Sequence, residues 1–154
     1  QAKFYSERAV QLNPSFPDAQ NILGQSLVHS GKFAESEKHF LKAIELNPLD
    51  PNAILYKDGL FFAQMGLGNY EIAYSLIEEC ISQFSKAGFY KGFRAAVLGY
   101  LDEKSEAKNA LDLYLSLRPN LKTKDDYKKI FVPNSSLADI LIEGLCLAGW
   151  EPED

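Results

Sequence analysis

The chain has 154 residues, of which 46% are hydrophobic and 24% are charged, and its formal net charge at pH 7 is −5. A chain of this length and apolar content can bury a sizeable core, which excludes a disordered protein. Because it is acidic and lacks a stripe of Lys and Arg, we expect neither nucleic acid nor anionic lipid as a partner. No apolar run approaches the ~18 residues that a membrane span needs, so we expect no membrane insertion.

The first segment, residues 2–12 (AKFYSERAVQL), is predicted to be a helix, and the given sequence does not open on the charged and apolar regions of a signal peptide. Since the first residue is Gln and Met65 is the only methionine, we expect a piece of a longer chain. Four apolar side chains of this segment form an edge that offers a surface for self-association. They are Phe4, Tyr5, Val10 and Leu12.

Two further helices are predicted over residues 18–30 and 34–46. In the first, apolar residues recur at steps of three and four, which is one helical stripe. They are Ala19, Ile22, Leu23, Leu27 and Val28. Gly31 then ends the helix, as glycine commonly does. The second helix stops at Asn47-Pro48, because a proline ring cannot continue a helix.

These helices belong to an internal repeat. The segment RAVQLNPSFPDA at 8–19 recurs as KAIELNPLDPNA at 42–53, an offset of 34 residues. The identical pairs join Ala9, Leu12, Asn13, Pro14, Pro17 and Ala19 to Ala43, Leu46, Asn47, Pro48, Pro51 and Ala53. A period of 34 residues with two helices resembles the tetratricopeptide repeat family. In residues 17–50 the family's small and large positions fall on Leu23, Gly24, Leu27, Phe40, Ala43 and Pro48, while Ser36 replaces the usual small residue.

A third and a fourth repeat follow the pattern more loosely. In the third, Gly59 takes the small position, and it lies 14 residues before Ala73, against 12 from Gly24 to Ser36. We place the two extra residues in the turn GLGN, residues 66–69. In the fourth repeat Ala95 replaces the glycine, while Ala107, Leu111, Tyr114 and Pro119 keep the family's spacing.

The tail departs from the repeat. Thr123 is predicted to cap a short helix that Phe131-Val132-Pro133 ends, and Ser135 or Ser136 to cap an apolar helix that ends at Gly149. We expect this last helix to cover the last repeat, although it can instead fill the groove of the repeats. Trp150 either covers the end of the stack or anchors a partner.

The predicted fold is therefore all-α: a right-handed tetratricopeptide-type superhelix of antiparallel helix pairs with C-terminal capping helices. Residues 1–119 hold the repeats, as a partial repeat at 1–16 and full repeats at 17–50, 51–85 and 86–119. Residues 120–154 hold the capping helices.

No catalytic or metal-binding pattern is evident, so we predict no enzyme activity, no cofactor and no metal. The turn 66–69 lacks the preceding strand and the following Lys-Ser/Thr of a phosphate-binding loop. His29 and His39 have too few further ligands around them for a metal site. Cys80 and Cys146 lack the spacing of a zinc site or a disulfide framework, and we interpret both as buried, inert thiols.

The resemblance implies a concave groove, lined by the first helix of each repeat, that binds a peptide or a partner domain. The family's groove positions fall on Asn21, Gln25, His29, Tyr56, Leu60, Gln64, Phe89 and Tyr100. One subtype grips a C-terminal carboxylate with cationic side chains, and Tyr56 and Leu60 stand where those cations are needed, which excludes that subtype. We therefore expect a non-catalytic protein-interaction scaffold.

A second hypothesis rests on the C-terminal residues. The ending LIEGLCLAGW resembles the segment after repeat arrays in some bacterial class III adenylate cyclases and winged-helix regulators. The matching residues are Gly144, Leu145, Ala148 and Gly149, with Leu117, Arg118 and Pro119 upstream. That resemblance implies a regulatory or sensor domain of a bacterial signalling enzyme or transcription regulator. The expected location is the cytoplasm, or the periplasm for a sensor domain.

Overall fold

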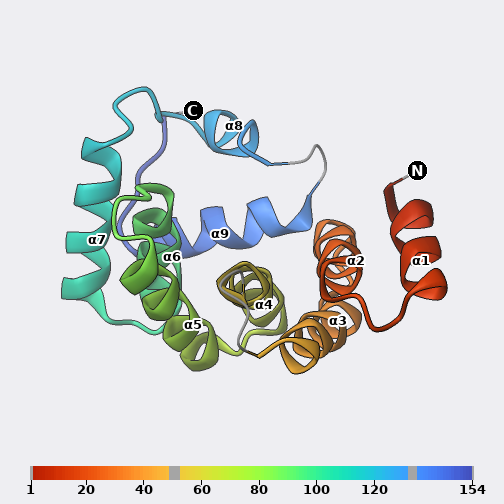
Figure 1. Cartoon of the computed structure of the whole chain (residues 1–154). Helices are drawn as coiled ribbons and strands as arrows, with labels where there is room; N and C mark the ends of the chain where they lie inside the picture. The colour runs from red at the N-terminus through yellow and green to blue at the C-terminus, as the bar shows by residue number, and fades with distance from the viewer. Residues whose placement is uncertain (1, 49–52, 132–134, 154) are drawn as a thin grey trace.

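The computed structural model describes residues 2–48, 53–131 and 135–153 (Figure 1). Within them the chain forms helices and an isolated bridge between Thr123 and Glu153, but no β-strand. The helices are α1 (Ala2–Leu12), α2 (Pro17–His29), α3 (Phe33–Leu46), α4 (Ala53–Leu67), α5 (Tyr70–Gln83), α6 (Phe89–Tyr100), α7 (Lys104–Ser116), α8 (Lys124–Lys128) and α9 (Ser136–Leu147). Pro51 of the predicted repeat, and Val132 and Pro133 in the tail, lie outside the described residues.

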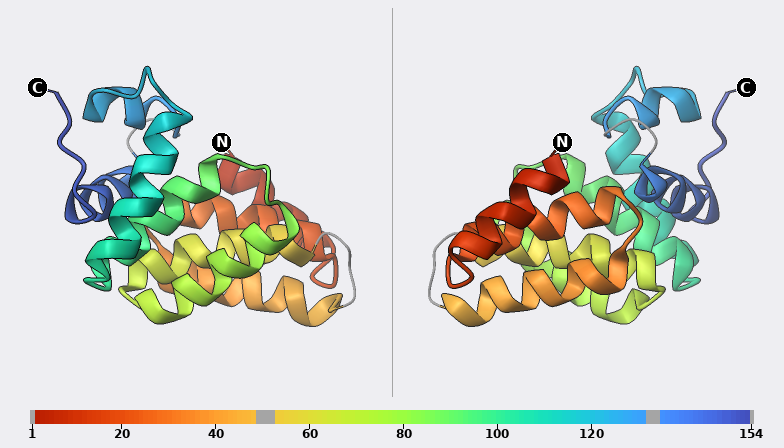
Figure 2. Two further views of the ribbon diagram at one scale, coloured as in Figure 1. Left: turned by 90° about the vertical axis from the view of Figure 1, so that its left-hand side faces the viewer. Right: turned by 90° about the vertical axis from the view of Figure 1, so that its right-hand side faces the viewer.

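Successive helices pack side by side from α1 to α7, and each turn reverses the chain direction. The resulting arc runs from α1 at one end to α7 at the other (Figure 1), and Figure 2 shows the same order edge-on. The predicted all-α, tetratricopeptide-type arrangement of helix pairs is confirmed.

The turns inside the three pairs α2–α3, α4–α5 and α6–α7 share one backbone conformation. Each contains a residue with positive φ, namely Gly31 (71°), Gly68 (76°) and Asp102 (58°). The next residue donates its backbone N–H to the carbonyl five residues earlier, which closes the helix end as a Schellman motif. These bonds join Lys32 to Leu27 at 2.9 Å, Asn69 to Gln64 at 3.0 Å and Glu103 to Leu98 at 3.1 Å. The predicted stop at Gly31 is thereby explained.

The two extra residues of the third repeat lie in helix α4, so their predicted place in the turn is wrong. Helix α4 continues to Leu67, and only Gly68 and Asn69 connect it to α5. The helix can continue through Gly66 because the ring of Phe33 from α3 lies where a side chain would be. A Cβ atom at Gly66 would lie 2.2 Å from Cγ of Phe33.

The core between the first two pairs is built around Phe40 of α3, which is fully buried. Its ring lies between α2 and α4, where Cβ atoms on Gly24 and Gly59 would come within 2.8 and 2.2 Å of its Cε1 atom. In the last pair, Gly92 makes similar room for the ring of Tyr114, at 2.8 Å. The glycines thus let aromatic rings fill the space between neighbouring helices.

The tail begins with the predicted cap at Thr123. The Thr123 hydroxyl accepts from the Asp126 N–H at 3.1 Å, and the Asp126 carboxylate accepts from the Thr123 N–H at 3.1 Å. The bond from the Lys129 ammonium group, together with this capping box, lowers the pKa of Asp126. Helix α8 ends at Lys128, earlier than predicted. Trp150 is buried beside Tyr127, with ring centroids 6.0 Å apart, so it is not an exposed anchor for a partner.

Helix α9 packs mainly on α6, as expected of a helix that covers the last repeat. It also contacts α4 and α2. Figure 1 shows it, in blue, crossing the inner side of the arc above α4. The C-terminal helix therefore lies on the concave face that the sequence predicts as a binding groove.

Candidate functional site

The concave face holds the candidate site, and α2 contributes three of the predicted groove residues to it. Gln25 is exposed and His29 is half-buried, and both line a cavity described below. Asn21 is buried, and its Oδ1 atom has no hydrogen-bond partner among the described residues.

The predicted groove residues of α4 do not lie on an open surface, which corrects their assignment. Tyr56, Leu60 and Gln64 are all buried. The Tyr56 hydroxyl donates to the Asp18 carboxylate at 2.9 Å, and the Gln64 amide donates to the Glu37 carboxylate at 2.7 Å. Tyr56 and Gln64 therefore join α4 to α2 and α3, respectively.

The α4 residues that do face the concave side are Asp58, Gly59 and Phe62, which the groove prediction missed. Gly59 and Phe62 lie 34 positions after Gln25 and Val28, which line the same cavity. The prediction instead aligned Gly59 with Gly24, an offset of 35 that turns the helix by about 100°. An offset of 34 from Gln25 locates Gly59, whereas Phe62 corresponds to Val28, which the prediction did not place in the groove.

The fourth repeat supplies Phe89 and Tyr100. Phe89 is 41% exposed and its ring packs against Tyr90. Tyr100 stacks on Tyr70 with ring centroids 4.2 Å apart. Its hydroxyl lies 2.8 Å from the carbonyl oxygen of Ile140 and 3.1 Å from the carboxylate of Glu143, both in α9.

Two of the predicted groove side chains thus contact the protein's own tail. Besides Tyr100, His29 places its Nδ1 atom 3.3 Å from the hydroxyl oxygen of Ser135, the residue before α9. The Ser135 contact lies just before the start of α9, whereas Ile140 and Glu143 lie in the middle of the helix. Polar groups of the concave face therefore hold α9 at its start and in its middle.

The α6 and α9 backbones touch where they cross. A Cβ atom on Gly99 would lie 2.2 Å from the carbonyl oxygen of Gly144, and one on Gly144 would lie 2.6 Å from the carbonyl oxygen of Ala96. Only residues without side chains allow so close an approach. The position of α9 on the concave face is thereby set by backbone contact.

A cavity of about 200 Å³ remains between α2, α4 and the start of α9. Its lining combines apolar side chains with polar groups, which include a carboxyl and an imidazole. The lining residues are Gln25, Val28, His29, Phe40, Asp58, Gly59, Phe62, Phe131 and Leu137. Most ligand sites measure about 300–1,000 Å³, so a cavity of this size suits only a small ligand.

Burial shifts the pKa values of the two titratable groups that line this cavity, Asp58 and His29. It raises the pKa of Asp58 to about 6, although a hydrogen bond with Tyr90 partly offsets the rise. The Oδ1 atom of Asp58 has no hydrogen-bond partner within the described part of the chain. Burial also lowers the pKa of His29. At neutral pH the cavity therefore holds an ionised carboxylate and a neutral imidazole.

Other potentially reactive groups are already engaged or inert. The His39 Nδ1 atom lies 2.7 Å from the amide oxygen of Gln20. Cys80 is fully buried, and burial raises its pKa to about 12, which agrees with an inert thiol. Cys146 is partly exposed, against the prediction. Across residues 2–48, 53–131 and 135–153, no three His, Cys, Asp or Glu side chains group as metal ligands, and no helix is long and apolar enough to span a bilayer.

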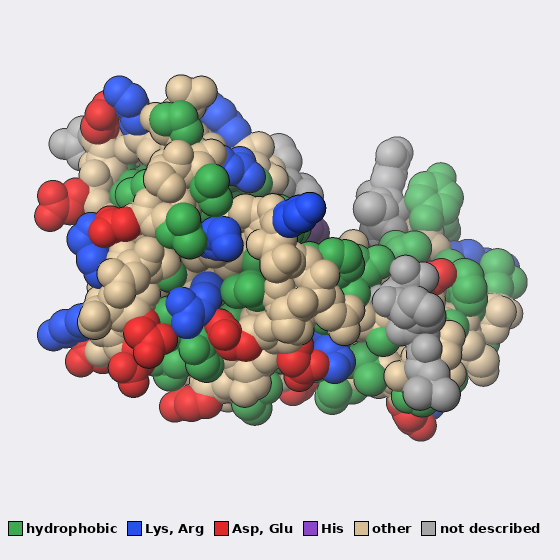
Figure 3. All heavy atoms as spheres, turned by 60° about the vertical axis from the view of Figure 1, so that its left-hand side comes forward, with side chains coloured by type: hydrophobic (Ala, Val, Ile, Leu, Met, Phe, Trp, Pro, Cys, Tyr) green, Lys and Arg blue, Asp and Glu red, His purple; other side chains and the backbone are tan. Residues whose placement is uncertain are grey.

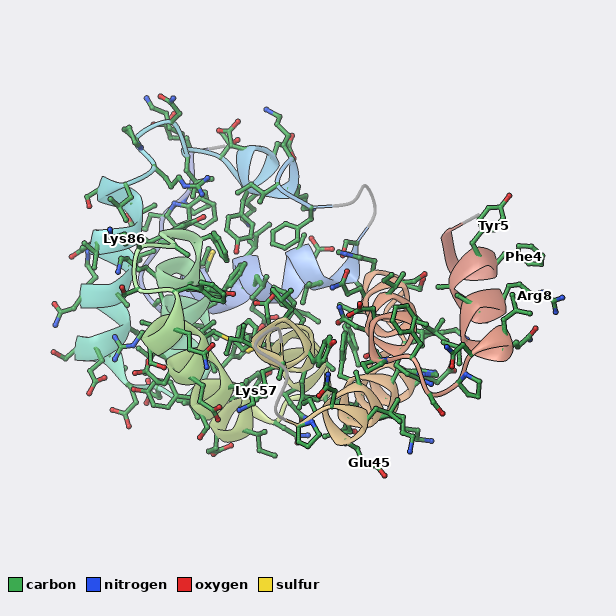
Figure 4. The ribbon with its side chains drawn as sticks, in the orientation of Figure 1. Phe4, Tyr5, Arg8, Glu45, Lys57 and Lys86 are labelled. Carbon is green, nitrogen blue, oxygen red and sulfur yellow. The ribbon has the colours of Figure 1, made fainter. Side chains whose placement is uncertain are left out.

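The edge of α1 is a separate feature. Phe4, Tyr5 and Leu12 are 67, 68 and 71% exposed, while Val10 is partly covered. Figure 4 shows Phe4 and Tyr5 pointing away from the rest of the molecule. Hydrophobic side chains gather at this end in Figure 3, whereas charges of both signs are interspersed over the opposite end.

Comparison with known proteins identifies one segment. Residues 17–50, which contain α2 and α3, match the family model described as the tetratricopeptide repeat. No curated protein matches the chain.

Proposed function

Because residues 17–50 are a tetratricopeptide repeat, a fold that generally serves protein–protein interaction rather than catalysis, we propose that the chain is a non-catalytic interaction module. It binds a helical segment of a partner on the concave face of α2, α4 and α6. One observation carries this proposal: the same face already holds a helix, α9.

The way α9 is held supports helix recognition. Leu137, Leu141 and Leu145, spaced four residues apart, are at most 1% exposed and form its apolar face. An amphipathic helix in a groove is recognised through such spaced apolar anchors. The polar contacts of His29 and Tyr100 hold the start and the middle of the helix. A partner helix with the same anchors and a small residue at the α6 crossing would take the place of α9.

Occupation by α9 lowers the affinity for such a partner. A partner helix can bind there only after α9 leaves. The apparent Kd therefore equals the intrinsic Kd divided by the fraction of molecules in which the face is open. Weakening the α9 contact therefore strengthens partner binding, which gives the proposal a direct test.

The test uses the full chain and a fluorescent peptide of residues 135–150, which contains the α9 sequence. Fluorescence anisotropy measures its binding to the wild type, to Gly144→Ala and to the control Gly88→Ala. Gly144→Ala introduces a Cβ atom at the α6 crossing, whereas a Cβ on Gly88 meets only Cδ1 of Leu117, at 3.3 Å. We expect Gly144→Ala to bind the peptide at least about tenfold more tightly than the other two proteins.

The addition of Tyr100→Phe to Gly144→Ala should weaken the peptide again, because the hydroxyl contact with the helix is lost. Equal binding to all three proteins, or no binding to any of them, would contradict a concave face that accepts a helix.

The resemblance to a signalling-protein ending gains no support from the residues that carry it. Gly144 and Ala148 belong to the α6 crossing. Gly149, with a φ of 101°, ends α9 through a bond from the Trp150 N–H to the Leu145 carbonyl at 2.9 Å. Helix packing accounts for these residues, so the interaction module remains our proposal.

The exposed apolar side chains of α1 support the predicted self-association at this end. Light scattering at two protein concentrations tests it. We expect the mean mass to rise with concentration in the wild type and to stay at the monomer value in a variant with Phe4→Ser and Leu12→Ser.

A further inference from the structure

We propose that the cavity between α2, α4 and the start of α9 binds a small organic cation, an alkylguanidinium or alkylammonium group. This site goes beyond the proposed function, because the chain forms the cavity with its own α9, through Leu137, and needs no partner helix to do so.

The shape and lining of the cavity suit a short hydrocarbon chain with a charged end. Its volume is about 200 Å³, and Val28 and Leu137 supply aliphatic surface. The rings of Phe40, Phe62 and Phe131 also line it. Aromatic faces attract cations, and guanidinium groups in particular stack on them.

The carboxyl of Asp58 supplies the charge that selects a cation. Its Oδ1 atom is buried, and the described residues provide no hydrogen-bond donor for it. The Tyr90 hydroxyl bonds to the carboxyl but carries no charge, and a buried carboxylate is costly unless a cation pairs with it. The adjacent Lys57 does not neutralise Asp58, because its ammonium group pairs with Glu79.

The remaining polar lining adds no competing cation. His29 is held 3.3 Å from Ser135, and burial favours its neutral form. Gln25 is uncharged. Asp58 is therefore the charged side chain among the residues that line the cavity, which favours a cation over an anion or a neutral ligand.

The experiment measures binding to the full chain by NMR titration or calorimetry. The probe is n-butylguanidinium, and n-butylurea is the neutral control of similar shape. Two variants make the same change of charge: Asp58→Asn in the cavity and Asp112→Asn on the exposed face of α7. Thermal unfolding verifies that both variants are folded.

We expect saturable binding of n-butylguanidinium that Asp58→Asn weakens by about 10- to 100-fold, as loss of a hydrogen bond to a charged group does. Asp112→Asn should bind like the wild type, and n-butylurea at least about tenfold more weakly than the cation. Equal binding to the wild type and Asp58→Asn would overturn the proposal. So would equal binding of the neutral probe, or no saturation up to about 50 mM, since well-fitted fragments of this size reach higher affinity.

A last pair of probes identifies where the cation comes from. N-acetyl-arginine N-methylamide presents the same group on a peptide backbone. Binding of this compound as tight as that of n-butylguanidinium indicates an arginine side chain of a partner. Binding of the free cation alone indicates a small-molecule ligand. Failure of both would end the cation proposal and leave the helix-binding proposal, which the α9 peptide tests separately.

Discussion

Substitution of Gly144 by Ala tests how firmly α9 is seated. The added Cβ atom would lie 2.6 Å from the carbonyl oxygen of Ala96 and 2.9 Å from Cε2 of Tyr100. The backbone oxygen cannot rotate away as the end of a side chain can. The helices must therefore separate by about 0.8 Å to restore an ordinary contact of 3.4 Å.

Two opposing effects set the size of the change. Overpacking of a well-filled contact costs about 1–3 kcal/mol. Replacement of a glycine inside a helix by alanine returns about 0.5–1 kcal/mol. We expect a net loss of about 1–2 kcal/mol in the free energy of unfolding, which lowers Tm by about 2–8 °C in a domain of this size.

Thermal unfolding followed by circular dichroism measures the Tm, and hydrogen exchange reports protection of the α9 amides. Gly88→Ala is the matched control, and we expect its Tm to lie within about 2 °C of the wild type. Gly99→Ala perturbs the same crossing, so the double variant should lose less than the sum of the single losses. An unchanged Tm with unchanged protection of α9 would refute the backbone contact as the feature that seats this helix.

Five further substitutions probe the turns, the cavity and the tail. Asp102→Gly should stabilise the chain by about 0.5–1 kcal/mol in urea unfolding, because its positive φ suits glycine, whereas Gly31→Ala should destabilise it by about 1 kcal/mol or more. Asp58→Asn should stabilise the chain at pH 7 by up to about 3 kcal/mol and have little effect near pH 4. The pKa of Asp58 is about 6 in the folded state and 3.8 in the unfolded state. The contribution of this carboxyl to the free energy of unfolding is therefore fully present below pH 3.8 and is lost as the pH rises through 6. Tyr100→Phe should cost about 1–2 kcal/mol, while Tyr127→Phe should cost nothing, since the buried Tyr127 hydroxyl has no hydrogen-bond partner among the described residues.

For each of these substitutions, one experimental result would contradict the prediction. Asp102→Gly would fail as a test of the turn if it destabilised the chain as Gly31→Ala does. A gain from Asp58→Asn that is the same at pH 4 and pH 7 would show that ionisation of the carboxyl is not the cause. Equal losses for the two tyrosine variants would show that the bond from Tyr100 to α9 adds nothing.

The sequence by itself determined the helices and the turns between them. Gly31, Pro48 and the 34-residue recurrence are local signals, because each acts through the backbone conformation of a few neighbouring residues. The repeat also identified Phe40 as a core residue, because equivalent positions of a repeat are buried to a similar extent.

Tertiary structure alone decided what lies on the concave face. A shift of one residue in aligning α4 moved the predicted groove from Gly59, which lines the cavity, to Leu60 and its neighbours, which are buried. No repeat position predicted that Asp58 and Phe62 also line the cavity. The place of α9 depends on Gly99 and Gly144, which are far apart in sequence and meet only when the chain is folded. Local patterns fix which residues are helical, but the direction in which a helix faces and the partner it meets depend on contacts between distant segments.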